Sequence, residues 1–316
     1  MNILKKLRGL LSLFSLTKGR AVGDLLLFLP LTIMAQDDVI SCLEVYDLKT
    51  NTHTVVREFD YKIEAPNWSP DGKWFVYNSG GRLFKLPTEN PSAEPIEIDT
   101  GSAKGCNNDH VISSDGKWIG LSDKWPSKVF VVPFEGGEPR EVTPDGPSYL
   151  HGISPDGSEV AYCAFRGDKR AVCTKRLDDS PERCLTDADG LNDGPEYSPD
   201  GRHIWFNSSR TGEMHVWRMN VDGTEQTQMT FHDSLYSWFP HVSPNGKWVV
   251  YICYSKGDLK ADEHLPNKNV ELRLMTSKGK KDRQLVKLFG GQGTINVNSW
   301  SPDSKAFAFV SYRLKK

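Results

Sequence analysis

Histidines, carboxylates and amides gather at the same place in a repeated pattern of this sequence, just ahead of a short turn. His110 and His151 each stand three residues before such a turn, and His241 stands two residues before another. Imidazole can bind a metal ion or carry a proton near neutral pH. With carboxylates such as Asp193 and Glu196 close by, these histidines could complete a divalent-metal site. Whether they meet depends on the elements that hold them.

The turn itself occurs six times. Its copies are SPDG at 69–72, SSDG at 113–116, SPDG at 154–157, SPDG at 198–201, SPNG at 243–246 and SPDS at 301–304, and successive first serines are 44, 41, 44, 45 and 58 residues apart. Proline presets φ at the second position, Asp or Asn bonds back to the backbone, and glycine supplies a positive φ at the exit. A tight hairpin in every unit of a repeat protein is therefore predicted.

The residues around each turn predict four strands. An apolar or aromatic run follows every turn, for example WFVYN at 74–78, and then come a short strand, a second turn and a last short strand. Four antiparallel strands in about 44 residues are typical of a propeller blade. We therefore predict an all-β, six-bladed β-propeller. In its sixth blade, N-terminal strands (41–59) pair with C-terminal strands (294–312), which removes exposed sheet edges.

Propeller geometry places the candidate site. The strand before each turn lines the central channel, so residues just ahead of the turns ring the channel mouth on the opposite side. We name that side the loop face, and the side of the six turns the turn face, which we expect to be structural. An insertion at 255–269 explains the 58-residue spacing and also falls on the loop face. The predicted ligand-binding residues are Glu64, Asn108, His110, His151, Asp193, Glu196, Trp238, His241 and Asn296.

The first 35 residues differ from the rest. Basic residues precede LLLFLPLTIMA at 25–35, and the small residue Ala35 is a plausible cleavage point before Gln36. This order is typical of a secretory signal peptide. The apolar run is too short to span a bilayer, which takes about 20 residues, although an uncleaved amphipathic anchor is the alternative. We predict an exported, periplasmic protein whose residues 36–316 form one domain with no membrane span.

Charge and cysteine content exclude some classes of function. The chain has 39 Lys and Arg against 41 Asp and Glu, so it lacks the basic excess that nucleic-acid binding requires. It has six cysteines and no CxxC motif, which argues against a zinc ribbon. Cys163, Cys173 and Cys184 recur about every ten residues, on successive predicted strands. A cross-strand disulfide is one interpretation, but small buried side chains are favoured.

The turns, together with IWFNSSRTGEMHVWRMNVDG at 204–223, resemble the TolB-like β-propeller repeat family. The resemblance extends over roughly 41–316 and implies a propeller in a periplasmic protein. TolB proteins carry a further N-terminal domain, where this chain has only the predicted signal peptide. Because one propeller fold serves many functions, the family resemblance implies no activity.

Two functions remain open. The first is a non-catalytic, monomeric binding or scaffold module for a glycan or a protein ligand at the loop-face mouth of the channel. The second is a metal-assisted carbohydrate lyase or hydrolase that uses His110, His151 and His241 with acidic neighbours. Oligogalacturonate lyases, which are metal-using propellers, are distantly similar, but none of their ligand motifs matches here. A divalent metal is therefore the one cofactor considered.

Overall fold

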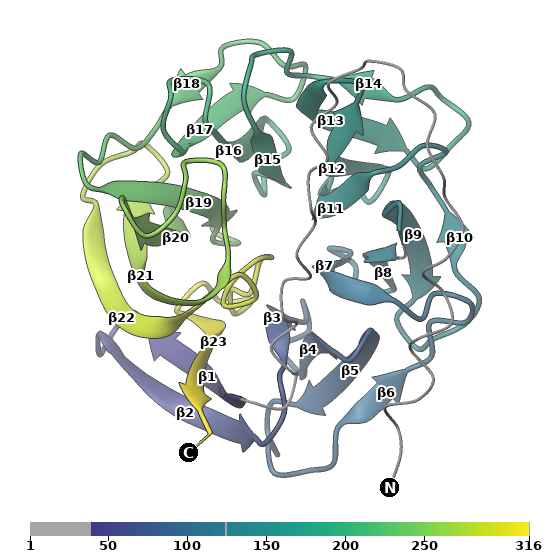
Figure 1. Ribbon diagram of the computed structural model, residues 1–316. Coiled ribbons are helices and arrows are strands. Elements are labelled where there is room, and N and C mark those ends of the chain that lie inside the picture. Colours follow the sequence, from purple (N-terminus) through teal and green to yellow (C-terminus); the bar gives the residue numbers. More distant parts are fainter. Residues whose placement is uncertain (1–38, 124, 316) are drawn as a thin grey trace, which may run out of the picture. The chain divides into compact units, whose positions relative to one another are not determined.

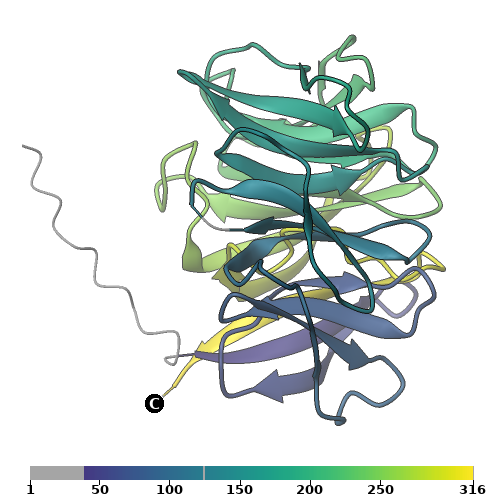
Figure 2. The same cartoon turned by 90° about the vertical axis from the view of Figure 1, so that its right-hand side faces the viewer.

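The computed structural model describes residues 39–123 and 125–315, and its regular elements are all strands. They form six blades around a central channel (Figure 1), as Figure 2 also shows from the side. The prediction of an all-β, six-bladed propeller is confirmed. The predicted signal peptide, residues 1–35, lies outside the described residues.

Blades one to five each hold four antiparallel strands in sequence order from the channel outwards. Blade one has β3 (Glu64–Trp68), β4 (Trp74–Ser79), β5 (Arg82–Pro87) and β6 (Ile96–Ile98), and blade two has β7 (Cys106–Ile112), β8 (Trp118–Asp123), β9 (Lys128–Pro133) and β10 (Arg140–Glu141). Blade three has β11 (Ser148–Ile153), β12 (Glu159–Arg166), β13 (Lys169–Arg176) and β14 (Arg183–Cys184). Blade four has β15 (Asn192–Tyr197), β16 (His203–Ser208), β17 (His215–Asn220) and β18 (Thr227–Gln228), and blade five has β19 (Leu235–Val242), β20 (Trp248–Ser255), β21 (Pro266–Thr276) and β22 (Arg283–Gly291).

The sixth blade joins the two ends of the propeller. The sheet has the order β2 (Thr52–Phe59), β1 (Val39–Asp47), β23 (Ala306–Leu314), and β1 pairs with β23 from Val39–Leu314 to Asp47–Ala306. The predicted pairing between the N-terminal and C-terminal strands is therefore confirmed. Residues 294–300 take the innermost position without forming a regular strand, and they meet β23 through one bridge and two further backbone bonds.

The six turns share one hydrogen-bond pattern, which explains their sequence. In blade three, Ser154 Oγ donates to Asp156 Oδ1 (2.6 Å) and accepts the backbone N–H of Glu159 (2.9 Å), while Gly157 has a φ of 70°. The one turn without proline uses its serine between blades, because Ser114 Oγ donates to the carbonyl of Pro155 (2.6 Å). Each turn thus joins the first two strands of its blade in a tight hairpin.

A β-bulge interrupts the innermost strand of each of the first five blades. The pairing register shifts at 64–67, 106–110, 150–152, 193–196 and 238–241. A bulge adds a residue on one strand, bends it and re-aims the side chains that follow. Because the bulges stand at equivalent positions around the channel, they decide which side chains face it.

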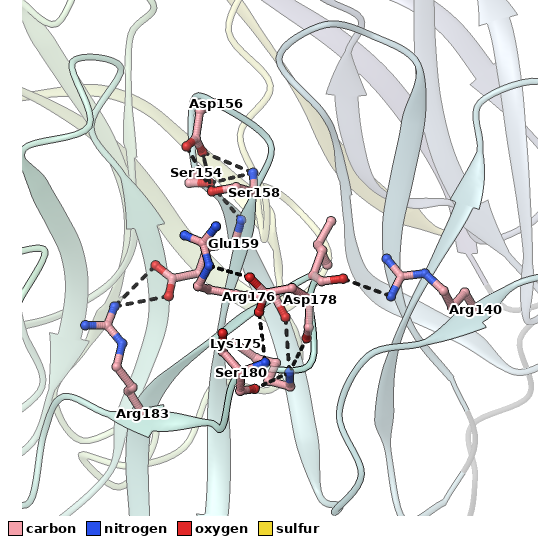
Figure 3. A network of polar contacts seen from close by, with 11 residues as sticks. Arg140, Ser154, Asp156, Ser158, Glu159, Lys175, Arg176, Asp178, Ser180 and Arg183 are labelled. Carbon is pink, nitrogen blue, oxygen red and sulfur yellow. Dashed lines mark hydrogen bonds and ion pairs between the residues drawn. The ribbon is translucent and has the colours of Figure 1, made fainter.

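Polar contacts secure the outer part of blade three near the turn face (Figure 3). Arg183 contacts Glu159 (3.1 Å), and Arg176 contacts Asp178 (2.9 Å). Lys175 donates to three backbone carbonyls of the 176–180 turn, so that this connection is held against β13. These contacts support the sheet and lie away from the channel.

Cys173 on β13 and Cys184 on β14 form a disulfide, whereas Cys163 is a buried free thiol. The interpretation favoured from the sequence, that all three are simply buried, is therefore wrong for one pair. The two half-cystines face each other because β13 and β14 pair at that position. The short edge strand β14 has only two residues, so a covalent link to β13 holds it more firmly than its hydrogen bonds.

Loss of this disulfide should destabilise the protein measurably. Replacing both cysteines with alanine frees a loop with a sequence separation of 11, which corresponds to about 3 kcal/mol of unfolding free energy in the chain-entropy model. Denaturant unfolding should show this loss for Cys173→Ala/Cys184→Ala, and added reductant should lower only the wild-type stability. Equal stability of the wild-type protein with and without reductant would contradict the prediction.

Candidate functional site

A cavity of about 340 Å³ opens among blades two, three and four on the loop face. Innermost strands β7, β11 and β15 supply most of its polar side chains, and the 255–269 insertion supplies others. Its lining consists of Asn107, Asp109, Tyr149, His151, Cys163, Phe165, Arg170, Leu191, Asp193, Asp262, His264 and Gln292. The cavity therefore combines aromatic surface with both signs of charge, and it lies on the face that the sequence predicts.

A buried histidine between two carboxylates forms the centre of this cavity. His151 Nε2 lies 3.3 Å from Asp193 Oδ1 and 3.8 Å from Asp109 Oδ1. All three side chains are less than a tenth exposed. We call these residues, with Asn296, the acid–histidine cluster. Asn296 Nδ2 donates to Asp109 Oδ1 (2.7 Å) and to the carbonyl of Asn108 (3.1 Å).

Bulged backbone holds the cluster in place. Gly194 has a φ of 62°, and its N–H donates to Asp193 Oδ1 (2.7 Å). Phe239 also has a positive φ, 49°, and its N–H donates to Asn207 Oδ1 (3.1 Å). The Phe239 ring stacks on the imidazole of His151, with ring centroids 5.4 Å apart. The positive φ values of Gly194 and Phe239 thus fix the carboxylate of Asp193 on one side of the cluster and the ring of His151 on the other.

The electrostatics of the cluster favour a charged histidine. Burial alone would lower the pKa of His151, but the hydrogen bond and charge of Asp193 and the charge of Asp109 outweigh it, so the pKa is raised. Burial also opposes ionisation of Asp193, yet the contact with His151 lowers its pKa to about 2. Burial raises the pKa of Asp109 to about 6. The cluster therefore favours the charged form of His151 and keeps a proton on Asp109 up to about pH 6.

Stability should depend on pH through this cluster. A histidine whose folded pKa is raised contributes stability below its unfolded pKa and loses it as the pH rises through the folded pKa. Asp109 acts in the same direction, because between about pH 4 and 6 the folded protein keeps a proton that the unfolded carboxyl has already released. We expect the stability of Asp109→Asn relative to wild type to increase between about pH 4 and 6.

The comparison with the variant is necessary because other histidines act in the opposite sense. Burial lowers the pKa of His110 to about 3 and also lowers that of His264. Through both groups, the stability of the folded protein increases as the pH rises through the pKa that histidine has in the unfolded chain. Thermal melts of wild type and Asp109→Asn are therefore compared at each pH. The difference between the two proteins removes the contributions of His110 and His264, which both share. A stability difference that stays constant from about pH 4 to 6 would refute the proposed titration of Asp109.

The other two predicted histidines belong to a separate buried belt that joins neighbouring blades. His110 lies 2.9 Å from Asn67 Oδ1 through Nδ1 and 3.4 Å from Asn78 Oδ1 through Nε2. His241 lies 2.7 Å from Glu196 Oε2 through Nδ1 and 2.9 Å from the carbonyl of Ile295 through Nε2. Both nitrogens of each ring are therefore engaged. The metal site considered as an alternative would need His110, His151 and His241 to meet, but the structure places His110 and His241 in this belt and His151 in the cavity lining.

Glu196, Glu64 and Trp238 are also outside the cavity lining. Glu196 accepts the N–H of Val242 (2.7 Å) and an amide N–H of Asn298 (2.8 Å), so it links three blades. Glu64 pairs with Lys62 (2.6 Å). Trp238 is 0% exposed and packs against other rings, which leaves no surface for a ligand. Of the nine predicted residues, His151 and Asp193 line the cavity, Asn296 holds Asp109 beside them, and the carbonyl of Asn108 accepts a bond from Asn296.

The insertion contributes residues that sequence reasoning missed. The ring of His264 lies 4.5 Å from that of Trp238 and 5.2 Å from that of Phe239. Asp262 contacts Arg170 of β13 at 3.5 Å, so the insertion closes one side of the cavity. The only signal for these residues was the long spacing between the fifth and sixth turns. That spacing placed the insertion on the loop face without showing which side chain turns inwards.

The side chains of the cavity are better suited to binding an organic ligand than to holding a metal ion. His151 Nε2 already faces the carboxylates of Asp193 and Asp109, and the protonated ring that these carboxylates favour has no free lone pair for a metal ion. Among the described residues, Cys173, Glu182 and Cys184 form a cluster with metal-ligand spacing, but its two sulfurs are joined in the disulfide. The cavity presents aromatic rings, carboxylates, amides and a guanidinium, which suit a polar ligand with apolar ring faces.

Comparison with known proteins gives consistent matches. Residues 146–284 match the family model of the TolB beta propeller domain. An uncharacterized protein of Agrobacterium fabrum is 45% identical over 276 residues, which cover 86% of this chain and 92% of that protein. A solved structure from Agrobacterium tumefaciens, provisionally assigned to TolB, has a TM-score of 0.83 at 43% identity and covers 88% of this chain and 99% of that one.

A more distant match comes from the Tol-Pal system protein TolB of Francisella tularensis. It is 27% identical over 214 residues, which cover 64% of this chain and 48% of that protein. The chain thus spans about half the length of that relative. No helix among residues 39–123 and 125–315 has the length and apolar character needed to cross a membrane.

Proposed function

Because the chain belongs to the TolB-like β-propeller family, we propose that it is an exported module that binds a glycan fragment in the loop-face cavity without chemical conversion. The observation that carries this proposal is the cavity itself. Its volume of about 340 Å³ falls within the range of small-ligand sites and is too small for a folded protein. Its polar groups come from six segments of the propeller: β7, β11, β13, β15, the 255–269 insertion and the residues after β22.

The lining favours a sugar over a purely apolar ligand. The rings of Tyr149 and Phe165 lie 5.8 Å apart in an edge-on arrangement and give the cavity its aromatic wall. Sugar rings pair an apolar face with hydroxyl groups, so an aromatic wall next to amides and carboxylates matches both parts. Arg170 adds a cation that could pair with an acidic sugar.

A binding assay tests the proposal. The purified protein should bind a member of a panel of neutral and acidic oligosaccharides in isothermal titration calorimetry. Tyr149→Ala should weaken that binding at least tenfold, because it removes part of the aromatic wall, whereas Tyr61→Ala, outside the cavity lining, should not. A panel without a binder, or equal affinity of wild type and Tyr149→Ala, would reject a glycan site.

A protein partner is the second candidate, favoured by two exposed aromatic residues on loop-face connections. Trp125 is 78% exposed between β8 and β9, and Phe231 is 73% exposed between β18 and β19. Exposed aromatic side chains often anchor protein interfaces. If glycans fail to bind, affinity capture with wild type and a Trp125→Ala/Phe231→Ala variant would test this candidate.

Export is the remaining part of the proposal. Its support is the order of basic and apolar residues before Gln36 and the family to which the chain belongs. Cell fractionation should recover the protein in the periplasm, and mass spectrometry should give a chain that begins at Gln36. A cytoplasmic protein with its first 35 residues intact would contradict export.

A further inference from the structure

A second cavity, of about 350 Å³, opens at the channel mouth on the turn face. From the sequence we expected this face to be structural only. His151 is the one residue that lines both this cavity and the loop-face cavity, so the two chambers approach each other at the acid–histidine cluster. The turn-face cavity is nevertheless built from different residues, and its surface has a different chemical character.

Its inner wall takes one residue from each blade, the one directly before the turn. These residues are Trp68, Ile112, Ile153, Tyr197, Val242 and Trp300. Five have side chains without charge or hydroxyl group. The sixth, Tyr197, directs its hydroxyl group to Glu159 Oε2 (2.7 Å), away from the channel lining. The six positions together therefore form a nearly continuous apolar ring.

Its outer wall also takes one residue from each blade, the second residue of the turn. These are Pro70, Ser114, Pro155, Pro199, Pro244 and Pro302. The single serine has its hydroxyl group occupied, because it donates to the carbonyl of Pro155. The proline that presets five of the turns thus has a second consequence, since the six equivalent turns place five apolar rings and one serine around the channel mouth.

Two amide side chains at the floor, Asn67 and Asn298, already have partners within the protein. Asn67 Nδ2 donates to the carbonyl of Asn298 (2.8 Å), and its Oδ1 meets His110. Asn298 Nδ2 donates to Glu196 and to the carbonyl of Val242, and its Oδ1 accepts the N–H of Trp300. A ligand therefore need not supply hydrogen bonds to satisfy Asn67 or Asn298, and a charged ligand would lose hydration without compensation.

Charges at the rim are paired within four of the six turns, and the other two turns carry one charge each, Asp156 in blade three and Lys247 in blade five. Asp71 pairs with Lys73 at 3.6 Å, and Asp115 pairs with Lys117 at 3.3 Å. In the sixth blade, Lys305 lies 3.0 Å from the carboxylate of the same turn. Over the six turns together the rim carries five acidic and five basic side chains, with no excess that would attract an anion or a cation. This balance complements a neutral ligand.

We propose that the turn-face cavity is a second binding site, which takes a neutral apolar molecule of about one or two aromatic rings. An apolar ring or the rings of a fused system would displace water from the two walls and leave the bonded floor unchanged. The cavity volume lies near the lower end of the range for small-ligand sites, which sets this size limit. The proposal does not depend on glycan binding at the loop face.

The neutral fluorescent probe N-phenyl-1-naphthylamine tests this site directly. Its emission rises in apolar surroundings, so a titration of the purified protein should show a saturable increase at one site. Ile153→Asp places a charge in the inner wall at a half-buried position and should weaken binding at least tenfold. Ile96→Asp is the matched control, because Ile96 lies on edge strand β6, is 47% exposed and should leave the affinity unchanged.

Two further variants keep the outcome unambiguous. Ile153→Ser tests the wall without adding a charge and should weaken binding less than Ile153→Asp, provided that circular dichroism shows both proteins folded. Tyr149→Ala should bind the probe as wild type does, because Tyr149 belongs to the other cavity. Failure to bind the probe, or equal affinities of wild type, Ile153→Asp and Ile153→Ser, would overturn the proposal, whatever the result of the glycan assay.

Discussion

The Glu196→Ala variant is expected to lose about 3–5 kcal/mol of unfolding free energy, the cost typical of breaking a buried charged pair. Glu196 is 6% exposed and serves three donors: His241 Nδ1, the N–H of Val242 and the side-chain amide of Asn298. Alanine leaves all three without this partner in a site that water cannot fill easily. Because the donors come from two other parts of the ring, the loss should weaken contacts among three blades.

An exposed carboxylate provides the control for this variant. Glu97 pairs with Arg82 at 2.6 Å, but its side chain is 45% exposed. Glu97→Ala should therefore change stability by no more than about 0.5 kcal/mol. Denaturant unfolding of both variants measures the difference. If Glu196→Ala were as stable as Glu97→Ala, the belt would not hold the blades together as we infer.

Gly194→Ala should be the second severe change, with an expected loss of about 2–5 kcal/mol from left-handed backbone strain and overpacking. Gly194 has a φ of 62°, and a Cβ added there would lie 2.6 Å from Asn207 Oδ1 and 2.9 Å from Phe239 Cδ1. Phe239 stacks on His151, so its displacement should also disturb the cavity. Glycan affinity should therefore fall together with stability.

Gly167→Ala separates the two causes. Gly167 has nearly the same φ, 60°, but a Cβ added there would have no other atom within 4 Å. Its substitution should cost only the backbone strain, about 1–2 kcal/mol, and leave ligand binding intact. Chemical unfolding and calorimetry on the two variants give the comparison. Equal losses at both positions would show that packing around the bulge of β15 is unimportant.

The fold was predictable because its signals are local and repeated. Each turn contains the residues that its backbone requires, as Ser154, Asp156 and Gly157 illustrate, and six copies at a blade-length spacing identify the architecture. The closure of the ring also followed from the sequence, since too many strands precede the first turn and too few follow the last. The irregular path of 294–300 did not follow, because its amides bond to residues far away in the chain.

The site was harder to predict because bulges break the alternation of side chains along a strand. Strict alternation treats residues two and three before a turn as facing opposite sides. In β7 and β11, the register shift falls near the histidine itself, and in β15 it falls between Asp193 and Glu196. Two acidic residues of one strand consequently belong to different networks. No pattern in the sequence shows how far each bulge turns the chain.

Long-range partners were also invisible in the sequence. His264 reaches the cavity from an insertion whose path depends on contacts with blade three. The Cys173–Cys184 disulfide depends on the register of a strand with only two residues, so the spacing of the cysteines alone could not decide between bonded and free. The loop face could thus be identified from the sequence, whereas the set of residues that meet there could not.

The pairing of β1 with β23 has a consequence for the order of folding events. Val39 pairs with Leu314, so the last blade needs strands that are separated by almost the whole described chain. Contacts of such sequence separation slow folding, because the chain must lose the entropy of closing a long loop before they form. Blades one to five can assemble from neighbouring segments as these emerge. The ring itself can close only when residue 314 reaches Val39, so its completion is a late step of folding.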